Sequence, residues 1–325
     1  MAGDVNTLVH IALFYRGDRE YLEAVVPFIL EGHAEGEPVF VAVPTAKLAL
    51  LRDALGGDAE RVSMFDMAEL GRNPARTFPA FSAVDDGGGW IRAVAEPIWP
   101  GRSAEAYPAC VQNEALFNEA FAGRRLITLC PYDAVSLDGS VLADARTTHP
   151  KIWTGQSLTD SPDFAHWEAL NRYNEPLPAD PQAVTSTLHS ITALSEARML
   201  AATFAESAGL PSERIGDLQL IVTELATNSL EYTGGDCTLA LWQRDGDIIC
   251  QVSDGGQLDD PLAGRRTPEL HQAGGRGLFL VNALADLVRT HTTADGTTIR
   301  AYLTVDRAAG LVAGPDSPMW SAAHG

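Results

Sequence analysis

The sequence predicts two folded units, an N-terminal α/β unit and a C-terminal α+β unit. In the first half, short apolar runs alternate with helical periods, which indicates a mainly parallel sheet. In the second half, two helical segments precede apolar runs that turn on Asp245-Gly246, a strong signal for an antiparallel hairpin. A stretch with weak periodicity and several prolines, over about 160–185, separates the two patterns and is typical of a linker with some local structure.

The first half reads as strands and helices in turn. Residues 8–14 form a short apolar run typical of a buried strand, and 18–30 carry apolar residues at a helical period. Pro44 suits the first turn of a helix over 44–55. We expect further strands at 39–43, 61–65, 91–95 and 126–130, and a further helix at 105–121.

The second half has a different order of elements. We expect helices at 191–208, 212–232 and 275–285, with strands at 237–244, 247–253, 288–292 and 297–305. Residues 257–273 are polar, contain Gly and Pro, and are typical of a mobile lid. The expected domain limits are 1–160 for the first unit, 161–185 for the linker, 186–306 for the second unit and 307–325 for a loose tail.

Composition limits the classes of function. The chain has 325 residues, which suffices for two domains, and 46% of them are hydrophobic, which supports packed cores. The net charge is −20, from 43 acidic and 23 basic side chains, so we expect no direct binding of nucleic acid. Strong acidity fits a protein partner with a basic surface, although it is also a common feature of soluble proteins.

The cysteines and the apolar segments bear on localisation. Cys110, Cys130, Cys237 and Cys250 show no CxxC spacing, so we expect reduced and mostly buried thiols in a cytoplasmic protein. The first residues lack the basic and apolar regions of a signal peptide. No apolar run reaches the roughly 18 residues that a membrane span needs, so we expect no membrane association.

Three motifs in the second half together predict a nucleotide site. Glu224 and Asn228 lie four residues apart, so on a helix they share one face. A carboxylate can polarise a hydroxyl, and an amide oxygen suits Mg²⁺, which takes few protein ligands. Downstream, Asp254 offers an acceptor for an exocyclic amine. The glycines of 274–277 let backbone N–H groups approach phosphates where a helix begins.

The order of these motifs resembles the GHKL ATPase superfamily over roughly residues 186–306. Glu224-Leu225-Ala226-Thr227-Asn228 is similar to its N-box, Asp254-Gly255-Gly256 to its adenine box, and Gly275-Arg276-Gly277-Leu278 to its phosphate box. Gly296-Thr297-Thr298-Ile299 falls where the family has a late Thr near adenine, whereas Gln257-Leu258 departs from the usual DxGxG. The resemblance implies a GHKL sandwich that binds ATP and Mg²⁺. It implies Glu224 as the catalytic residue, Asn228 as the Mg²⁺ ligand, and nucleotide contacts from Asn228, Asp254, Gly256, Gly275, Arg276, Gly277, Leu278 and Thr298.

Among GHKL branches, the compact layout most resembles the anti-sigma-factor serine kinases of bacterial partner switching. That resemblance implies phosphate transfer to a Ser or Thr hydroxyl on an anti-anti-sigma (STAS) partner, and sequestration of a sigma factor. Such kinases are often dimers, so a homodimer is a further expectation. Tyr232, Arg265 and Arg266 are additional candidates for phosphate contacts, against plain aromatic packing and exposure to water.

Three alternatives to this kinase stay open. A non-catalytic nucleotide-dependent binding module would use Asp254 and the glycines but not Glu224. A sensor histidine kinase would label His189, but Ser190 follows it where an acidic residue is typical, and no dimerisation hairpin fits before the ATPase core. A clamp ATPase like MutL is disfavoured because we expect no transducer domain after residue 306.

The first half resembles the MEDS domain, a sensory module found fused to anti-sigma kinases. The likeness spans about residues 10–150 and includes Phe14-Tyr15, Val41-Ala42-Val43-Pro44, Gly71-Arg72-Asn73-Pro74, Glu96-Pro97-Ile98-Trp99, Cys130-Pro131-Tyr132-Asp133 and Thr148-His149-Pro150. It implies a RecA/KaiC-like fold and small-molecule sensing, with an inert scaffold as the alternative. The two lysines, Lys47 and Lys151, follow no phosphate-binding loop, so we expect no phosphate transfer here. A ligand would favour the carboxyl ends of the strands, near 15–16, 44–45, 96–97 and 132–133.

Overall fold

The chain divides into two compact units, Met1–Tyr173 and Asn174–Gly325. The computed structural model describes residues 7–84, 89–155, 157–268 and 275–306. Within those ranges, no helix has both the length and the apolar character needed to cross a membrane. All four cysteines are free and buried, as the sequence predicts.

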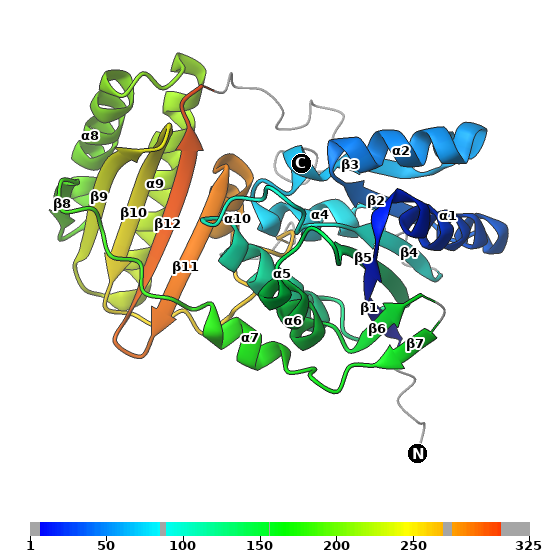
Figure 1. Cartoon of the computed structure of the whole chain (residues 1–325). Coiled ribbons are helices and arrows are strands. Elements are labelled where there is room, and N and C mark those ends of the chain that lie inside the picture. The colour runs from blue at the N-terminus through cyan, green and yellow to red at the C-terminus, as the bar shows by residue number, and fades with distance from the viewer. Residues whose placement is uncertain (1–6, 85–88, 156, 269–274, 307–325) are drawn as a thin grey trace. The chain divides into compact units, whose positions relative to one another are not determined.

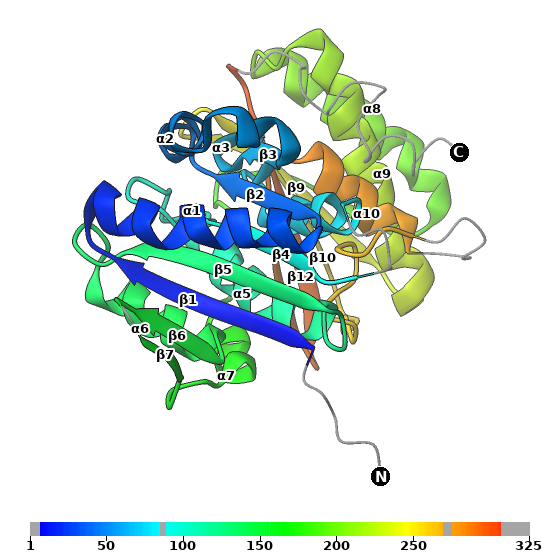
Figure 2. The ribbon, with the colours of Figure 1, turned by 90° about the vertical axis from the view of Figure 1, so that its right-hand side faces the viewer.

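Unit 1 is built on a seven-stranded sheet in the order β3-β2-β4-β5-β1-β6-β7 (Figure 2). Every pairing is parallel except the one between β6 and β7, which confirms the expected parallel-rich sheet. The strands are β1 (Leu8–Tyr15), β2 (Val39–Val43), β3 (Ser63–Asp66), β4 (Ile91–Ala95), β5 (Leu126–Asp133), β6 (Lys151–Thr154) and β7 (Ser157–Asp160).

Helices cover both faces of this sheet. Side chains on a strand alternate between faces, so Ile11 and Leu13 of β1 pack with α1 and α2, while Ala12 and Phe14 pack with α5 and α6. Figure 2 shows α1 on one side of the sheet and α5 to α7 on the other. The helices are α1 (Gly17–Glu35), α2 (Thr45–Leu55), η1 (Gly56–Arg61), α3 (Met67–Leu70), η2 (Pro74–Arg76), α4 (Thr77–Ser82), α5 (Tyr107–Ala120), α6 (Gly139–Thr148) and α7 (His166–Arg172).

Unit 2 is a five-stranded antiparallel sheet with helices on one face (Figure 1). The strand order is β11-β12-β10-β9-β8, and β9 joins β10 through Asp245 and Gly246, both with positive φ, as a tight hairpin requires. The strands are β8 (Val184–Leu188), β9 (Cys237–Arg244), β10 (Asp247–Asp254), β11 (Leu287–Thr293) and β12 (Gly296–Thr304). The helices are η3 (Ile191–Ala193), α8 (Leu194–Ser207), α9 (Ser212–Thr233) and α10 (Arg276–Leu284).

The core of unit 2 lies between the sheet and its helices. Leu218, Ile221 and Leu225 recur at a helical period on α9 and are buried against Leu239 and Cys250 of the sheet. Arg214 near the start of α9 forms a buried ion pair with Asp286, at 2.7 Å. This packing holds α9 in place, so the polar face of its second half is presented at a defined position.

The segment after Tyr173 is bound to the other face of this sheet. The Asn174 side chain donates to the Thr292 carbonyl and accepts from the Thr292 N–H. Arg300 of β12 donates to the Pro178 carbonyl, and Arg244 pairs with Asp180 at 2.9 Å. Residues 174–180, which lie within the expected linker 161–185, are therefore packed onto unit 2.

Candidate nucleotide-binding site

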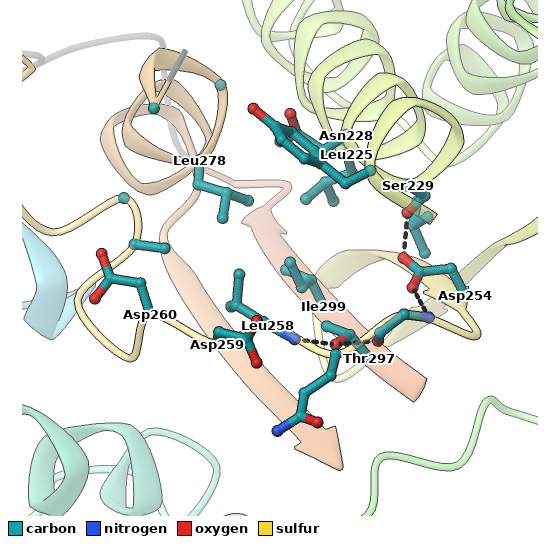
Figure 3. Close-up of a pocket in the computed structure, with 18 of the residues that line it drawn as sticks. Leu225, Asn228, Ser229, Asp254, Leu258, Asp259, Asp260, Leu278, Thr297 and Ile299 are labelled. Atoms are coloured by element: carbon teal, nitrogen blue, oxygen red, sulfur yellow. Dashed lines mark hydrogen bonds between the residues drawn. The ribbon is translucent and has the colours of Figure 1, made fainter. Parts of the chain in front are cut away.

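A cavity of about 570 Å³ opens in unit 2 between α9, the ends of β10 and β12, the loop after β10 and the start of α10 (Figure 3). Its volume lies in the range of small-molecule sites. Of the residues predicted to contact a nucleotide, Asn228, Asp254, Gly256, Gly275, Gly277 and Leu278 line the cavity. Glu224, Arg276 and Thr298 are not among the lining residues.

Helix α9 supplies one wall. It begins after Pro211 and ends at Gly234, whose left-handed conformation (φ 63°) suits glycine. Leu225, Asn228 and Tyr232 follow one another at intervals of three and four residues, so they share the face that lines the cavity. Glu224 lies one turn before Asn228, just outside the lining. The helix thus gives the cavity an amide where the sequence predicts the Mg²⁺ ligand.

Asp254, at the end of β10, is held by two donors. The Ser229 hydroxyl donates to its Oδ2 at 2.5 Å, and the Gly256 N–H donates to its Oδ1 at 2.8 Å (Figure 3). Each carboxylate oxygen can accept a second hydrogen bond, so the side chain keeps acceptor capacity for a ligand amine. Ser229 was not predicted as a site residue. Its place beside Asn228 on the buried side of α9 is the signal that would have found it.

Thr297 lines the cavity in place of Thr298. Side chains of β12 alternate, and Thr297 faces the cavity with Ile299, whereas Thr298 faces away and shares a hydrogen bond with Ser253 at 3.0 Å. The structure thus has Thr297, and not the predicted Thr298, on the cavity wall. The Thr297 hydroxyl donates to the Gly256 carbonyl and accepts from the Leu258 N–H, so it anchors the loop after β10.

The amino end of α10 packs against Glu224 and Asn228 of α9. A Cβ added at Gly277 would lie 2.6 Å from Glu224 Oε2, closer than real side chains approach, and 3.0 Å from Asn228 Nδ2. The structure thus brings Gly277 together with both N-box residues. Gly275 caps α10 with φ 81°, and Arg276 is exposed beside it. Free N–H groups at a helix start favour anions, so this corner suits a phosphate group.

The loop after β10 packs against α10. A Cβ at Gly264 would lie 2.7 Å from the Leu278 Cβ, and the Asn282 amide donates to the Gly264 carbonyl. Arg266 lines the cavity and lies 3.9 Å from Asp260, while Arg265 is half-buried outside the lining. Residues 269–274, which include part of the predicted lid and Gly274, lie outside the described residues.

The lining is more acidic than basic. Asp254, Asp259 and Asp260 line the cavity, and Arg266 is the one Lys or Arg among its described lining residues. A triphosphate would therefore need a cation to offset charge. Asn228 and the nearby carboxylate of Glu224 are oxygen donors of the kind that Mg²⁺ takes, so the residues present fit that ion. Burial, followed by the charge of Glu231, raises the pKa of Glu224.

The histidine of the disfavoured alternative and the predicted ligand edge of unit 1 both lie outside this cavity. His189 follows β8 outside any helix, and its side chain pairs with Asp236 at 2.8 Å. In unit 1, Tyr15 and Glu96 come together at the carboxyl ends of β1 and β4, where the Tyr15 hydroxyl donates to Glu96 Oε1 at 3.1 Å. Both side chains are buried, and burial raises the pKa of Glu96 to about 8.

Comparison with known families agrees with this division. Residues 9–150 match the family described as the methanogen/methylotroph, DcmR sensory (MEDS) domain, and residues 188–303 match the histidine kinase-like ATPase domain. Residues 9–150 are thus a MEDS domain, and residues 188–303 are a histidine kinase-like ATPase domain. The cavity described above lies within the ATPase domain, since its lining residues fall between Leu225 and Ile299.

A solved structure is also similar to part of this chain. A chain in the crystal structure of the SiaB-SiaC complex from Pseudomonas aeruginosa is 12% identical, and the match covers 37% of this chain and 88% of that chain with a TM-score of 0.31. No curated protein matches the chain.

Proposed function

We propose that the ATPase domain binds ATP with Mg²⁺ and transfers the γ-phosphate to a Ser or Thr hydroxyl on an anti-anti-sigma (STAS) protein. In the same proposal, the domain sequesters a sigma factor while unphosphorylated antagonist is scarce. The MEDS domain controls whether the ATPase domain holds the sigma factor or acts on the antagonist. The chain is then a cytoplasmic regulator of transcription that acts by partner switching.

One observation carries the nucleotide part of this proposal. A single cavity has a carboxylate fixed by two donors at one end, Asp254, and at the other end a glycine, Gly277, seated on Glu224 and Asn228. The first suits recognition of an adenine amine, and the second suits a phosphate group at a helix start. The distance between them is spanned by the apolar side chains of Leu225, Leu278 and Ile299, which suit a purine and its ribose.

The proposed reaction transfers one phosphoryl group and one proton. The partner hydroxyl oxygen forms a bond to the γ-phosphorus, the bond from that phosphorus to the β,γ-bridging oxygen breaks, and ADP leaves. Glu224 accepts the hydroxyl proton. Its raised pKa makes it a better proton acceptor than an exposed carboxylate. Mg²⁺ held by Asn228 would neutralise phosphate charge when bound.

A direct test measures nucleotide binding and phosphate transfer separately. Titration of the full chain with ATP and Mg²⁺ should give one site, and Asp254→Asn should weaken it. With a purified STAS protein, the wild type should transfer labelled phosphate to a Ser or Thr, and Glu224→Gln should bind ATP but transfer at least roughly a hundredfold more slowly. Absence of any binding by the folded wild type would sink the proposal.

A second function is favoured by the position of Glu224 outside the cavity lining. A non-catalytic module would bind nucleotide and change its affinity for a sigma factor or antagonist without transferring phosphate. Nucleotide-dependent capture of the partner, with no label on the partner or on the chain, would assign this function instead. Acid-labile label on the chain itself would indicate a histidine kinase.

For unit 1, we propose that the MEDS domain is a sensor with a RecA/KaiC-like fold. Its parallel strand order β3-β2-β4-β5-β1-β6 supports that fold class. A small-molecule ligand would bind at the carboxyl edge of the sheet, where the buried Glu96 Oε2 has no hydrogen-bond partner. Glu96→Gln should then change the response to the ligand. ATP binding by the full chain should stay unchanged.

A further inference from the structure

Four side chains that can bind a metal ion meet inside unit 1. His10 comes from β1, Glu114 from α5, Cys130 from β5 and His149 from the end of α6, and their ligand atoms all lie within 4.8 Å of one another. All four are buried, with exposed fractions between 0 and 5%. They lie on the face of the sheet that α5 covers, far from one another in sequence.

The distances inside the cluster suit a shared ion. Glu114 Oε2 lies 3.3 Å from His10 Nε2 and 3.0 Å from His149 Nε2, and Cys130 Sγ lies 3.5 Å from His10 Nε2. Ligand atoms around a tetrahedral Zn²⁺ lie about 3.3–3.8 Å apart, from bond lengths of about 2.0–2.3 Å. The cluster therefore needs only small adjustments to surround one ion.

The hydrogen bonds of the first histidine fix which ring nitrogen faces the cluster. The Asn118 amide nitrogen donates to the carbonyls of Glu114, Ala115 and Thr148, so its oxygen is the atom that meets His10 Nδ1, at 3.1 Å. An amide oxygen can only accept, so His10 Nδ1 carries the hydrogen. In the neutral ring, Nε2 then presents a bare lone pair to Glu114 and Cys130.

The second histidine is fixed in the same way. His149 Nδ1 lies 2.8 Å from the Ala145 carbonyl oxygen, which can only accept, so Nδ1 again carries the hydrogen. In the neutral ring, His149 Nε2 therefore presents a bare lone pair to Glu114 Oε2, at 3.0 Å. Metal-binding histidines commonly donate their second N–H to a carbonyl or amide oxygen in this manner.

Lone pairs that converge in a buried space repel one another unless something positive lies between them. We propose that His10, Glu114, Cys130 and His149 form a closed site for one divalent transition-metal ion of the Zn²⁺ type. With the thiol and the carboxyl ionised and both imidazoles neutral, the ligands carry two negative charges, which the ion balances. Nitrogen and sulfur ligands favour Zn²⁺ over Mg²⁺ or Ca²⁺.

The surroundings of the site indicate a structural rather than a catalytic ion. Four protein ligands leave no open position for a substrate. The rings of Phe117 and Tyr132 pack on His10 and His149, with centroid distances of 4.8 Å and 5.6 Å, and help to exclude water. The ion would tie β1, β5, α5 and α6 together at the centre of the MEDS domain.

The test uses the full chain without an affinity tag, because a histidine tag binds metals itself. The wild type grown with added zinc should contain about one zinc per chain by mass spectrometry of the metal. Cys130→Ser and His149→Gln should each retain less than about a tenth of that amount. Cys110→Ser is the matched control, since Cys110 is a buried cysteine of the same unit outside the cluster, and it should keep the metal.

Cobalt gives a second readout, and its wild-type measurement does not depend on any variant folding. The wild type loaded with Co²⁺ should show the absorption of a tetrahedral ion together with a thiolate-to-cobalt charge-transfer band. That band should be absent from folded Cys130→Ser and present in Cys110→Ser. A folded wild type that contains no metal and shows no cobalt bands would overturn the proposal, as would a Cys130→Ser protein with an unchanged metal content and spectrum.

Discussion

The Ser229 hydroxyl donates to Asp254 Oδ2 at 2.5 Å, across the junction between α9 and the end of β10. This bond joins the helix that carries Asn228 to the strand that carries the proposed adenine acceptor. It therefore sets the orientation of the Asp254 carboxylate before any ligand arrives, which lowers the cost of ordering it upon binding.

Removal of that donor should weaken nucleotide binding. In Ser229→Ala, Asp254 keeps only the Gly256 N–H, so the carboxylate is less well oriented. We expect roughly a fivefold loss of affinity for ATP with Mg²⁺ by calorimetry, the equivalent of one hydrogen bond of about 1 kcal/mol. Ser207→Ala, which removes an exposed hydroxyl from α8, is the control and should bind as the wild type does.

A side chain at Gly277 should disturb Glu224 and Asn228. In Gly277→Ala the new methyl group would lie 2.6 Å from Glu224 Oε2, so α10 or the N-box side chains must move. We expect at least a tenfold loss of affinity for ATP with Mg²⁺, since both the phosphate corner and Asn228 are displaced.

Gly216 provides the matched control on α9. A Cβ there meets no atom within 4 Å, and the residue is helical and exposed. Gly216→Ala should raise the free energy of unfolding by about 0.5–1 kcal/mol and leave ATP affinity unchanged. Equal binding by both glycine variants would show that the contact between α10 and α9 has no part in the site.

The neighbouring threonines of β12 should differ in effect. Thr297→Val removes the hydroxyl that holds the loop after β10 and leaves the Gly256 carbonyl without this donor. We expect a loss of about 1–3 kcal/mol in the free energy of unfolding, with weaker ATP binding. Thr298→Val removes one bond to Ser253 and should bind ATP normally. The reverse ranking would restore Thr298 as the contact residue.

Glu96 should make the stability of unit 1 depend on pH. Burial raises its pKa from 4.5 to about 8, so the folded form prefers the protonated acid. The contribution of this protonated acid to the free energy of unfolding is fully present below about pH 4.5. It falls as the pH rises from there and is lost once the pH has passed about 8. Urea unfolding should show the wild type losing up to roughly 1.4 kcal/mol per pH unit in that window, relative to Glu96→Gln.

The exposed Glu60→Gln variant is the control for that experiment. It should follow the wild type at each pH. A Glu96→Gln protein with the same pH dependence as the wild type would show that Glu96 is ionised in the folded state throughout.

Elements with strong periodicity or turn signals were predictable from the sequence. β2, β4 and β9 begin and end where the apolar runs do, and Asp245-Gly246 forms the expected hairpin turn. By contrast, β7 has every side chain exposed and β8 buries only one, so neither shows the alternation that marks a strand. α7 lies within the proline-bearing stretch over about 160–185, where the weak periodicity predicts no helix.

Contacts between distant elements could not be predicted in this way. The choice between Thr297 and Thr298 depends on which face of β12 meets the cavity, which the register with β10 decides. Sequence patterns also do not predict the contact between His10 and Cys130, because these residues are 120 positions apart and meet only through the pairing of β1 with β5. Motif order predicted which segments line the candidate nucleotide site, whereas the pairing register decides which of their side chains face the cavity.

The central claim is that the cavity in the ATPase domain holds ATP through Asp254. Calorimetric titration of the full chain with ATP and Mg²⁺, beside the Asp254→Asn variant, tests it most directly. The account predicts one nucleotide per wild-type chain and an affinity at least roughly tenfold lower for a folded Asp254→Asn protein. Identical titration curves for the two proteins, or no heat from either, would contradict it.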